Sequence, residues 1–98
     1  MTEEIREICR AAIRAYGTRH QMKKAIEEMG ELIAALMRFP GRSTADDVIT
    51  EIADVLITAS QLALMFGESR VTEEVKRKIE RLRERAAEAE KQKEYYGN

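Results

Sequence analysis

Several residue types are scarce or absent in this chain. It has no tryptophan, one proline, one cysteine, one histidine and five glycines, and only 5% of its residues are aromatic. The lone cysteine, Cys9, cannot form a disulfide within the chain, and its place on the apolar side of a helical segment predicts a small buried group. With 44% apolar and 36% charged residues, this composition excludes a disordered chain or a β-sandwich and indicates amphipathic helices.

An excess of one charge is also lacking. Seventeen basic and eighteen acidic side chains give a net charge of −1, so no overall field attracts nucleic acid or a membrane surface. No uninterrupted apolar stretch reaches the ~18 residues of a membrane span, and none follows a basic start as in a signal peptide. We therefore expect no nucleic-acid or membrane partner and a cytoplasmic location.

Glycine and proline divide the chain into four helical segments, which predicts a single all-α domain over residues 1–98. The second and third segments should form a central antiparallel hairpin about Phe39-Pro40-Gly41. Two segments begin with the spacing of a capping box, in Thr18 with Gln21 and in Thr44 with Asp47. The expected helices run from Thr2 to about Tyr16, from Thr18 to about Arg38, from Thr44 to Phe66, and from Thr72 to a frayed tail at 94–98.

The third segment carries two apolar stripes with a narrow polar strip between them. A helix on the surface of one chain shows a single apolar stripe. We expect the first stripe to pack inside the subunit and the second to pack on another copy, in a dimer or tetramer. The first comprises Val48, Ile52, Val55, Ala59, Ala63 and Phe66, the second Ala53, Ile57, Ser60 and Leu64, and the strip Asp47, Glu51, Asp54, Thr58 and Gln61.

Two pairs of acids face each other in the predicted hairpin. Glu28 and Glu31 share a face of the second segment at i, i+3 spacing, as do Glu51 and Asp54 on the third. Both pairs are centred on Gly41, so a symmetric turn places four carboxylates at one level. Such a cluster requires neutralisation, and oxygen ligands favour Mg²⁺ or Mn²⁺ over zinc. A solvated acidic face is the alternative interpretation of each half taken alone.

This acidic pattern resembles the signature of the all-α nucleotide pyrophosphohydrolases, which include MazG-like proteins, dimeric dUTPases and phosphoribosyl-ATP pyrophosphatases. The resemblance covers about residues 18–85 and is greatest to short MazG-like proteins. It implies that Glu28, Glu31, Glu51 and Asp54 hold Mg²⁺ and that a nucleoside triphosphate is hydrolysed to a monophosphate and pyrophosphate. Glu27 and Glu31 are the candidates for the general base, and the sequence does not choose between them.

Other candidates would contact the substrate. The resemblance places basic residues of the last helix, here Lys78 and Arg81, on the phosphates. Lys24, one turn before Glu28, is a phosphate-facing or ligand-orienting candidate. His20 with Gln21 is a candidate contact for the base, whereas the tyrosines are too few and too terminal to predict a stacking platform.

The substrate and the activity itself have alternatives. A pyrimidine or non-canonical deoxynucleotide is favoured among the substrates, with phosphoribosyl-ATP ranked last. The rival hypotheses are a non-catalytic helical oligomer that uses the acids as a structural cation or nucleotide-sensing site, and a helical interaction protein without metal. The number of metal ions also stays open.

Overall fold

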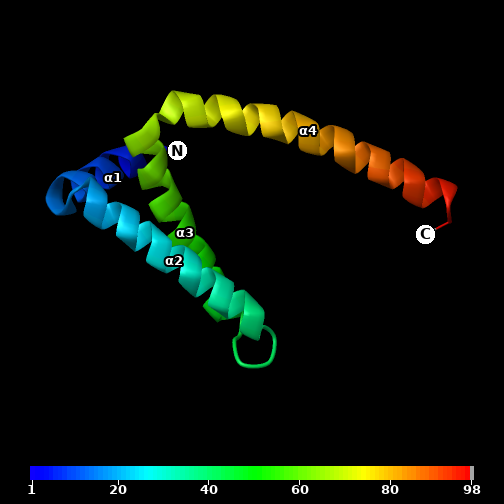
Figure 1. Ribbon diagram of the computed structural model, residues 1–98, viewed down its shortest axis with the longest axis horizontal. Coiled ribbons are helices and arrows are strands. Elements are labelled where there is room, and N and C mark those ends of the chain that lie inside the picture. Colours follow the sequence, from blue (N-terminus) through cyan, green and yellow to red (C-terminus); the bar gives the residue numbers. More distant parts are fainter. Residues whose placement is uncertain (98) are drawn as a thin grey trace. The chain divides into compact units, whose positions relative to one another are not determined.

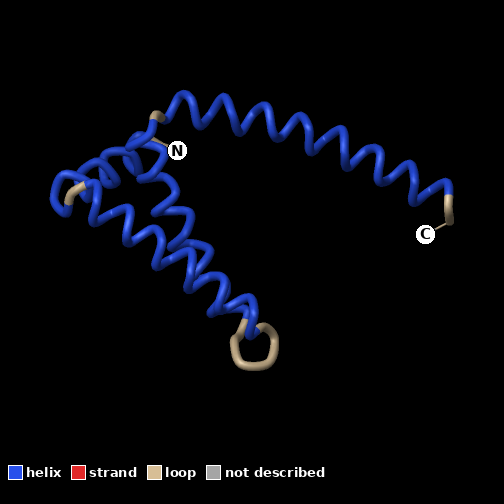
Figure 2. The backbone as a smooth tube through the Cα atoms, viewed as in Figure 1, coloured by secondary structure: helices blue, strands red, loops and turns tan. Residues whose placement is uncertain are grey.

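The computed structural model describes residues 1–97 and contains four helices, as the sequence predicts (Figures 1 and 2). No strand occurs within this range. The chain divides into two compact units, Met1–Phe66 and Gly67–Asn98. The first unit holds α1 (Glu3–Tyr16), α2 (Thr18–Arg38) and α3 (Ala45–Phe66), and the second holds α4 (Glu68–Tyr95).

Two helix starts follow the predicted capping chemistry. The Thr2 hydroxyl accepts a hydrogen bond from the amide of Ile5 at 3.2 Å at the start of α1. Before α3, the Thr44 amide donates to Asp47 Oδ2 at 2.8 Å, and the Asp47 amide donates to Thr44 Oγ1 at 3.1 Å. Each of these bonds satisfies an amide that has no partner within the helix at its first turn. The hydrogen bonds from the Thr44 amide and hydroxyl also lower the pKa of Asp47.

The capping box predicted for α2 and the start predicted for α4 are wrong, although α2 begins at Thr18 as expected. Gly17 and Gly67 adopt positive φ angles of 88° and 122°, and each carbonyl at once accepts the first bond of the next helix. Helix α2 therefore has no side-chain cap, and its expected partner Gln21 is buried elsewhere. Helix α4 begins at Glu68, so Thr72 lies inside it. It also continues to Tyr95 instead of fraying from residue 94, and Asn98 lies outside the described residues.

Helices α2 and α3 pack against each other as the predicted hairpin, and α1 contacts both (Figure 1). The residues that form the seam between α2 and α3 recur every three or four positions. This spacing keeps one face of a helix on its partner. Much of this seam is polar. Its buried members are Gln21, Ala25, Glu28 and Ala35 from α2, and Thr58 and Gln61 from α3.

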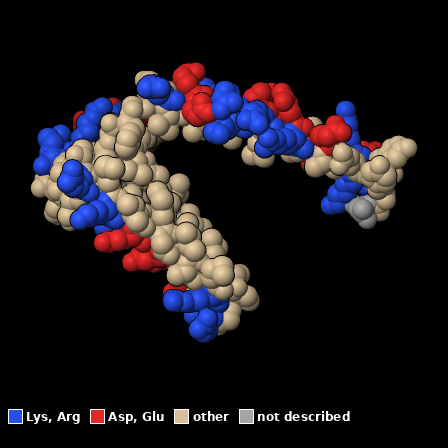
Figure 3. Space-filling view, in the orientation of Figure 1, with Lys and Arg blue, Asp and Glu red and all other residues tan. Residues whose placement is uncertain are grey.

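The predicted core stripe of α3 is therefore not the face that packs on α2. Thr58 and Gln61, from the polar strip, are the buried residues of α3, whereas Ile52 is 43% and Phe66 67% exposed. On α2, Ile26 and Ile33 are likewise more than 60% exposed. A broad surface without charged side chains runs along the hairpin (Figure 3). Both apolar stripes flank the seam, and no large side chain is fully buried among the described residues. Cys9, at 2% exposure, is buried as predicted.

Helix α3 is also long and apolar enough, by length and composition alone, to cross a membrane, with an 18-residue window of mean hydropathy 1.5. Counting only uninterrupted apolar runs overlooks this window. A mostly buried core helix of a soluble protein meets the same criteria, whereas 11% of this window is buried in the single chain. Buried Thr58 and Gln61 lie on the face of this helix that packs on α2.

The second unit is a single helix that buries none of its described residues. Its apolar side chains Val75, Ile79 and Leu82 are each more than half exposed. Charged residues of both signs cover the rest, and several pair along the helix, including Lys78 with Glu74 at 4.0 Å. Contact of Lys78 or Arg81 with a substrate phosphate stays a prediction.

Candidate metal centre and nucleotide pocket

Three of the four predicted metal ligands converge in the hairpin. Glu28 of α2 and Glu51 and Asp54 of α3 each place a carboxylate oxygen so that the three oxygens lie within 4.8 Å of one another. Glu28 is buried, and the other two are half-buried. We call these three residues the carboxylate cluster. It occupies the seam because i, i+3 spacing directs Glu51 and Asp54 of α3 toward the same side of α2.

Two oxygens of this cluster have no partner. Glu28 Oε2 and Glu51 Oε2 are buried without a hydrogen-bond donor. A buried carboxylate oxygen without a donor is costly, and neighbouring like charges add to the cost. Oxygen ligands of this kind are those that hard divalent cations bind. The residues present therefore fit a cation of the magnesium or manganese type, and no cysteine or histidine belongs to the cluster.

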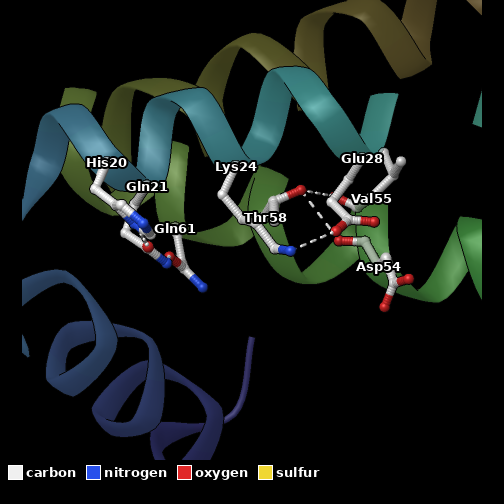
Figure 4. Close-up of polar contacts among 8 residues, drawn as sticks. All are labelled: His20, Gln21, Lys24, Glu28, Asp54, Val55, Thr58 and Gln61. Atoms are coloured by element: carbon white, nitrogen blue, oxygen red, sulfur yellow. Dashed lines mark hydrogen bonds and ion pairs between the residues drawn. The ribbon is translucent and has the colours of Figure 1, made fainter. Parts of the chain in front are cut away.

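Lys24 supplies the cation nearest to this cluster. Its Nζ lies 3.1 Å from Glu28 Oε1, one turn away on α2 (Figure 4). The hydrogen bond and the charge of Glu28 raise the pKa of Lys24. Lys24 thus orients one oxygen of Glu28 and leaves the other, Oε2, free for a ligand. The ligand-orienting and phosphate-facing roles considered for Lys24 from the sequence stay predictions.

The backbone beneath the cluster is held by a buried hydroxyl. Thr58 Oγ1 lies 3.0 Å from the carbonyl of Asp54 and 3.2 Å from that of Val55, and it donates to these oxygens (Figure 4). Since Thr58 is 6% exposed, this hydroxyl is satisfied within its own helix.

The remaining predicted acids lie outside the cluster. Glu31 is exposed on α2 and is not part of the group of converging oxygens. Glu31 and Glu51 are equally distant from Gly41 in the sequence, as predicted. However, Glu31 lies three residues beyond Glu28 and further round the helix, so its side chain is away from the seam. Glu27 is exposed too, and it lines a pocket together with Lys24.

That pocket lies where α1 meets α2. It has a volume of about 390 Å³ and is lined by Tyr16, His20, Gln21, Lys23, Lys24 and Glu27. It brings together the predicted base contacts, His20 and Gln21. Tyr16, which is not among the predicted base contacts, stacks on His20 with 5.5 Å between ring centroids. Because Gly17 breaks the helix between them, the four-residue separation of Tyr16 and His20 did not predict this contact.

The buried amides of Gln21 and Gln61 connect this pocket to α3. Gln21 Nε2 donates to Gln61 Oε1 at 2.6 Å, and both residues are 6% exposed. His20 Nδ1 lies 2.9 Å from Gln21 Oε1 (Figure 4). Because a carbonyl oxygen only accepts, this nitrogen of His20 carries the proton.

Fold and site together define an all-helical protein with a cation-type carboxylate cluster in a helix hairpin. The model of the MazG nucleotide pyrophosphohydrolase domain matches residues 17–89. The chain belongs to this family. Membership supports nucleotide pyrophosphohydrolase activity in general, and members of the family generally depend on divalent cations. Comparison with curated proteins and with solved structures gave no match.

Proposed function

We propose that this protein hydrolyses nucleoside triphosphates to nucleoside monophosphates and pyrophosphate with the help of Mg²⁺. The observation that carries the proposal is the carboxylate cluster of Glu28, Glu51 and Asp54, with its two unpartnered buried oxygens, in a chain of the MazG family. A triphosphate is a polyanion, so these carboxylates bind it only with cations between them.

Glu28, Glu51 and Asp54 would hold the ion, and Glu31 would join from its exposed position on α2. A divalent ion held there supplies Lewis acidity and neutralises charge on the phosphates. Mn²⁺, which also prefers oxygen ligands, would substitute. Lys24 keeps Glu28 in place through their ion pair, and Lys78 and Arg81 are further candidates for the phosphates.

The chain itself must also remove a proton from the attacking water. Glu27 and Glu31 are the two candidates, since each is an exposed carboxylate within one turn of Glu28 and a general base must reach its proton. Glu27 also lines the pocket, where water and substrate would meet, and this position favours Glu27 as the general base. Replacing each acid by its amide separates the two roles.

We further propose that the working form is a homo-oligomer, a dimer or a tetramer. Apolar side chains on both flanks of the hairpin are exposed in the single chain; Leu56 and Ile57 of α3, for example, are 63% and 52% exposed. Exposed apolar surface of this extent marks an interaction site. A second copy of the hairpin offers the same apolar surface, as an isologous interface requires.

The test is a pyrophosphate-release assay over a panel of nucleotides with Mg²⁺ or Mn²⁺. The panel should include pyrimidine and non-canonical deoxynucleotides, which we favour as substrates, and phosphoribosyl-ATP. Asp54→Asn should abolish release, while Asp46→Asn, an exposed aspartate of the same helix, serves as the matched control. Absence of metal-dependent release from every nucleotide would reject the enzyme. Stabilisation by Mg²⁺ alone would then identify a structural cation site.

A further inference from the structure

The pocket between α1 and α2 does not include the carboxylate cluster, but Lys24 lies between the two. Its volume of about 390 Å³ lies within the range of small-molecule sites, roughly 300–1,000 Å³. Lys24 lines the pocket and reaches Glu28 Oε1 at 3.1 Å. His20 precedes Glu28 by eight residues, so about 12 Å of helix separates them. An extended nucleoside triphosphate spans such a separation.

One wall of the pocket is an aromatic platform made of Tyr16 and His20. The two rings are 5.5 Å apart with 27° between their planes. They belong to different helices, and Gly17, with φ at 88°, makes the break that places one beside the other. Tyr16 is 65% exposed, so ring surface is available to a ligand. A planar aromatic group stacks well on such a surface.

Hydrogen bonds through two buried glutamines fix the orientation of the His20 ring in this platform. Its Nδ1–H donates to Gln21 Oε1 at 2.9 Å, and Gln21 in turn donates to Gln61 Oε1 at 2.6 Å. Both glutamines are buried, and a buried amide keeps its hydrogen bonds because losing them is costly. The chain of bonds leaves Nε2 of His20 without a partner among the described residues.

We propose that this pocket binds the nucleobase of the substrate against Tyr16 and His20, while the phosphates extend along Lys24 to the carboxylate cluster. The inference rests on the proposed function and adds to it the site that reads the nucleoside. Tyr16 and His20 are binding residues in it, and Gln21 and Gln61 position the His20 ring. The cations Lys23 and Lys24 keep the pocket attractive to an anionic ligand.

The single histidine of the chain makes the test direct. Its Hε1 proton gives one resonance, which can be followed by NMR while dCMP and dAMP are added to the protein in Mg²⁺. We expect saturable upfield ring-current shifts of His20 and of the Tyr16 ring. Deoxyribose 5-phosphate and inorganic pyrophosphate, which lack a base, should leave both at the position seen with Mg²⁺ alone. Equal shifts with and without a base would overturn the proposal.

Variants of the platform supply a second measurement. Tyr16→Leu should weaken monophosphate binding and raise KM about 5- to 20-fold, the lower part of the range for base–aromatic stacking because Tyr16 is largely exposed. The value of kcat should change less than twofold. Tyr16→Phe keeps the ring and should restore binding. Tyr95→Leu removes an exposed tyrosine of α4 and is the matched control.

The outcomes separate this inference from the function on which it rests. The base pocket would be refuted, and the enzyme left intact, by one combination of results. In it the protein hydrolyses nucleotides, the His20 resonance does not shift when they are added, and Tyr16→Leu has the native KM. Base-dependent shifts without any hydrolysis would support the pocket and reject the enzyme. Far-UV circular dichroism of Tyr16→Leu confirms that the helices are retained.

Discussion

Gln21 and Gln61, 40 positions apart, share a buried hydrogen bond of 2.6 Å between α2 and α3. The two residues are equidistant from Gly41, as are Glu28 and Asp54. The Gln21–Gln61 hydrogen bond therefore requires the same register of the hairpin that brings Glu28 next to the acids of α3. A shift of one residue in either helix would separate both pairs, so the bond that orients His20 also aligns the carboxylate cluster.

The Gln21–Gln61 pair predicts a large cost for a single substitution. Gln61→Ala leaves the buried Gln21 amide without its acceptor and should lower the free energy of unfolding by about 1–3 kcal/mol. The double variant Gln21→Met, Gln61→Met removes both polar groups and should recover much of this loss. Urea unfolding at one fixed protein concentration measures it. Gln92→Ala, at an exposed site of α4, should stay within about 0.5 kcal/mol of the native chain.

The carboxylate cluster predicts opposite effects on function and on stability. Glu51→Gln and Asp54→Asn remove an anionic ligand, so Mg²⁺ affinity and turnover should each fall by more than the roughly 10- to 100-fold typical of outer-shell partners. The metal-free fold should be equally or more stable, because like-charge repulsion is relieved. Mg²⁺ titration, pyrophosphate release and thermal melts measure these quantities. Native activity in Asp54→Asn, or its unfolding without metal, would make the acids structural partners.

The general base is separable from the ligands. If Glu27 takes the proton, Glu27→Gln should lower turnover about 10²- to 10⁴-fold while Mg²⁺ affinity stays near native. Glu31→Gln should lower turnover and Mg²⁺ affinity together if Glu31 is a ligand. The two titrations, run beside the release assay, assign the roles. Near-native turnover in Glu27→Gln would exclude it as the base.

The exposed hairpin flanks predict self-association. Light scattering should give at least twice the chain mass of 11.2 kDa, with Ile57 and Leu64 covered by another subunit. Ile57→Asp places a charge in that apolar surface and should dissociate the assembly, whereas Glu84→Lys, at an exposed site of α4, should not. A monodisperse native monomer at micromolar concentration would contradict the proposed oligomer.

The capping box of α3 predicts a pH dependence. The Thr44 amide and hydroxyl lower the pKa of Asp47 below its ordinary value of 3.8. The folded chain therefore binds this proton less readily than the unfolded chain. The stabilisation is present above pH 3.8 and is lost as the pH falls through the lower folded value. Thermal melts of native protein and Asp47→Ala should differ at about pH 6, and the difference should shrink as the pH falls below 3.8.

Local chemistry made much of the molecule predictable. The bond from the Ile5 amide to the Thr2 hydroxyl at the start of α1, and the bonds between Thr44 and Asp47 before α3, join near neighbours in the sequence and could be predicted from it. The register of Glu28 with Asp54 also followed, because a short turn about Gly41 leaves antiparallel helices little freedom. The cap predicted for α2 and the start predicted for α4 were wrong for a local reason as well: a glycine at positive φ can end one helix and open the next without a side-chain cap.

What the sequence by itself determined is the all-α class, the hairpin and the acids that it brings together. Only the tertiary structure decided which faces meet. Periodicity marks every apolar stripe as a candidate for burial, yet the α2–α3 seam buries Thr58 and Gln61 and leaves Ile52 and Ile57 exposed. It also decided that Glu31 stays outside the cluster and that Tyr16 meets His20. The reason is geometric: the rotation of a helix about its axis depends on all its neighbours together, and no single segment encodes it.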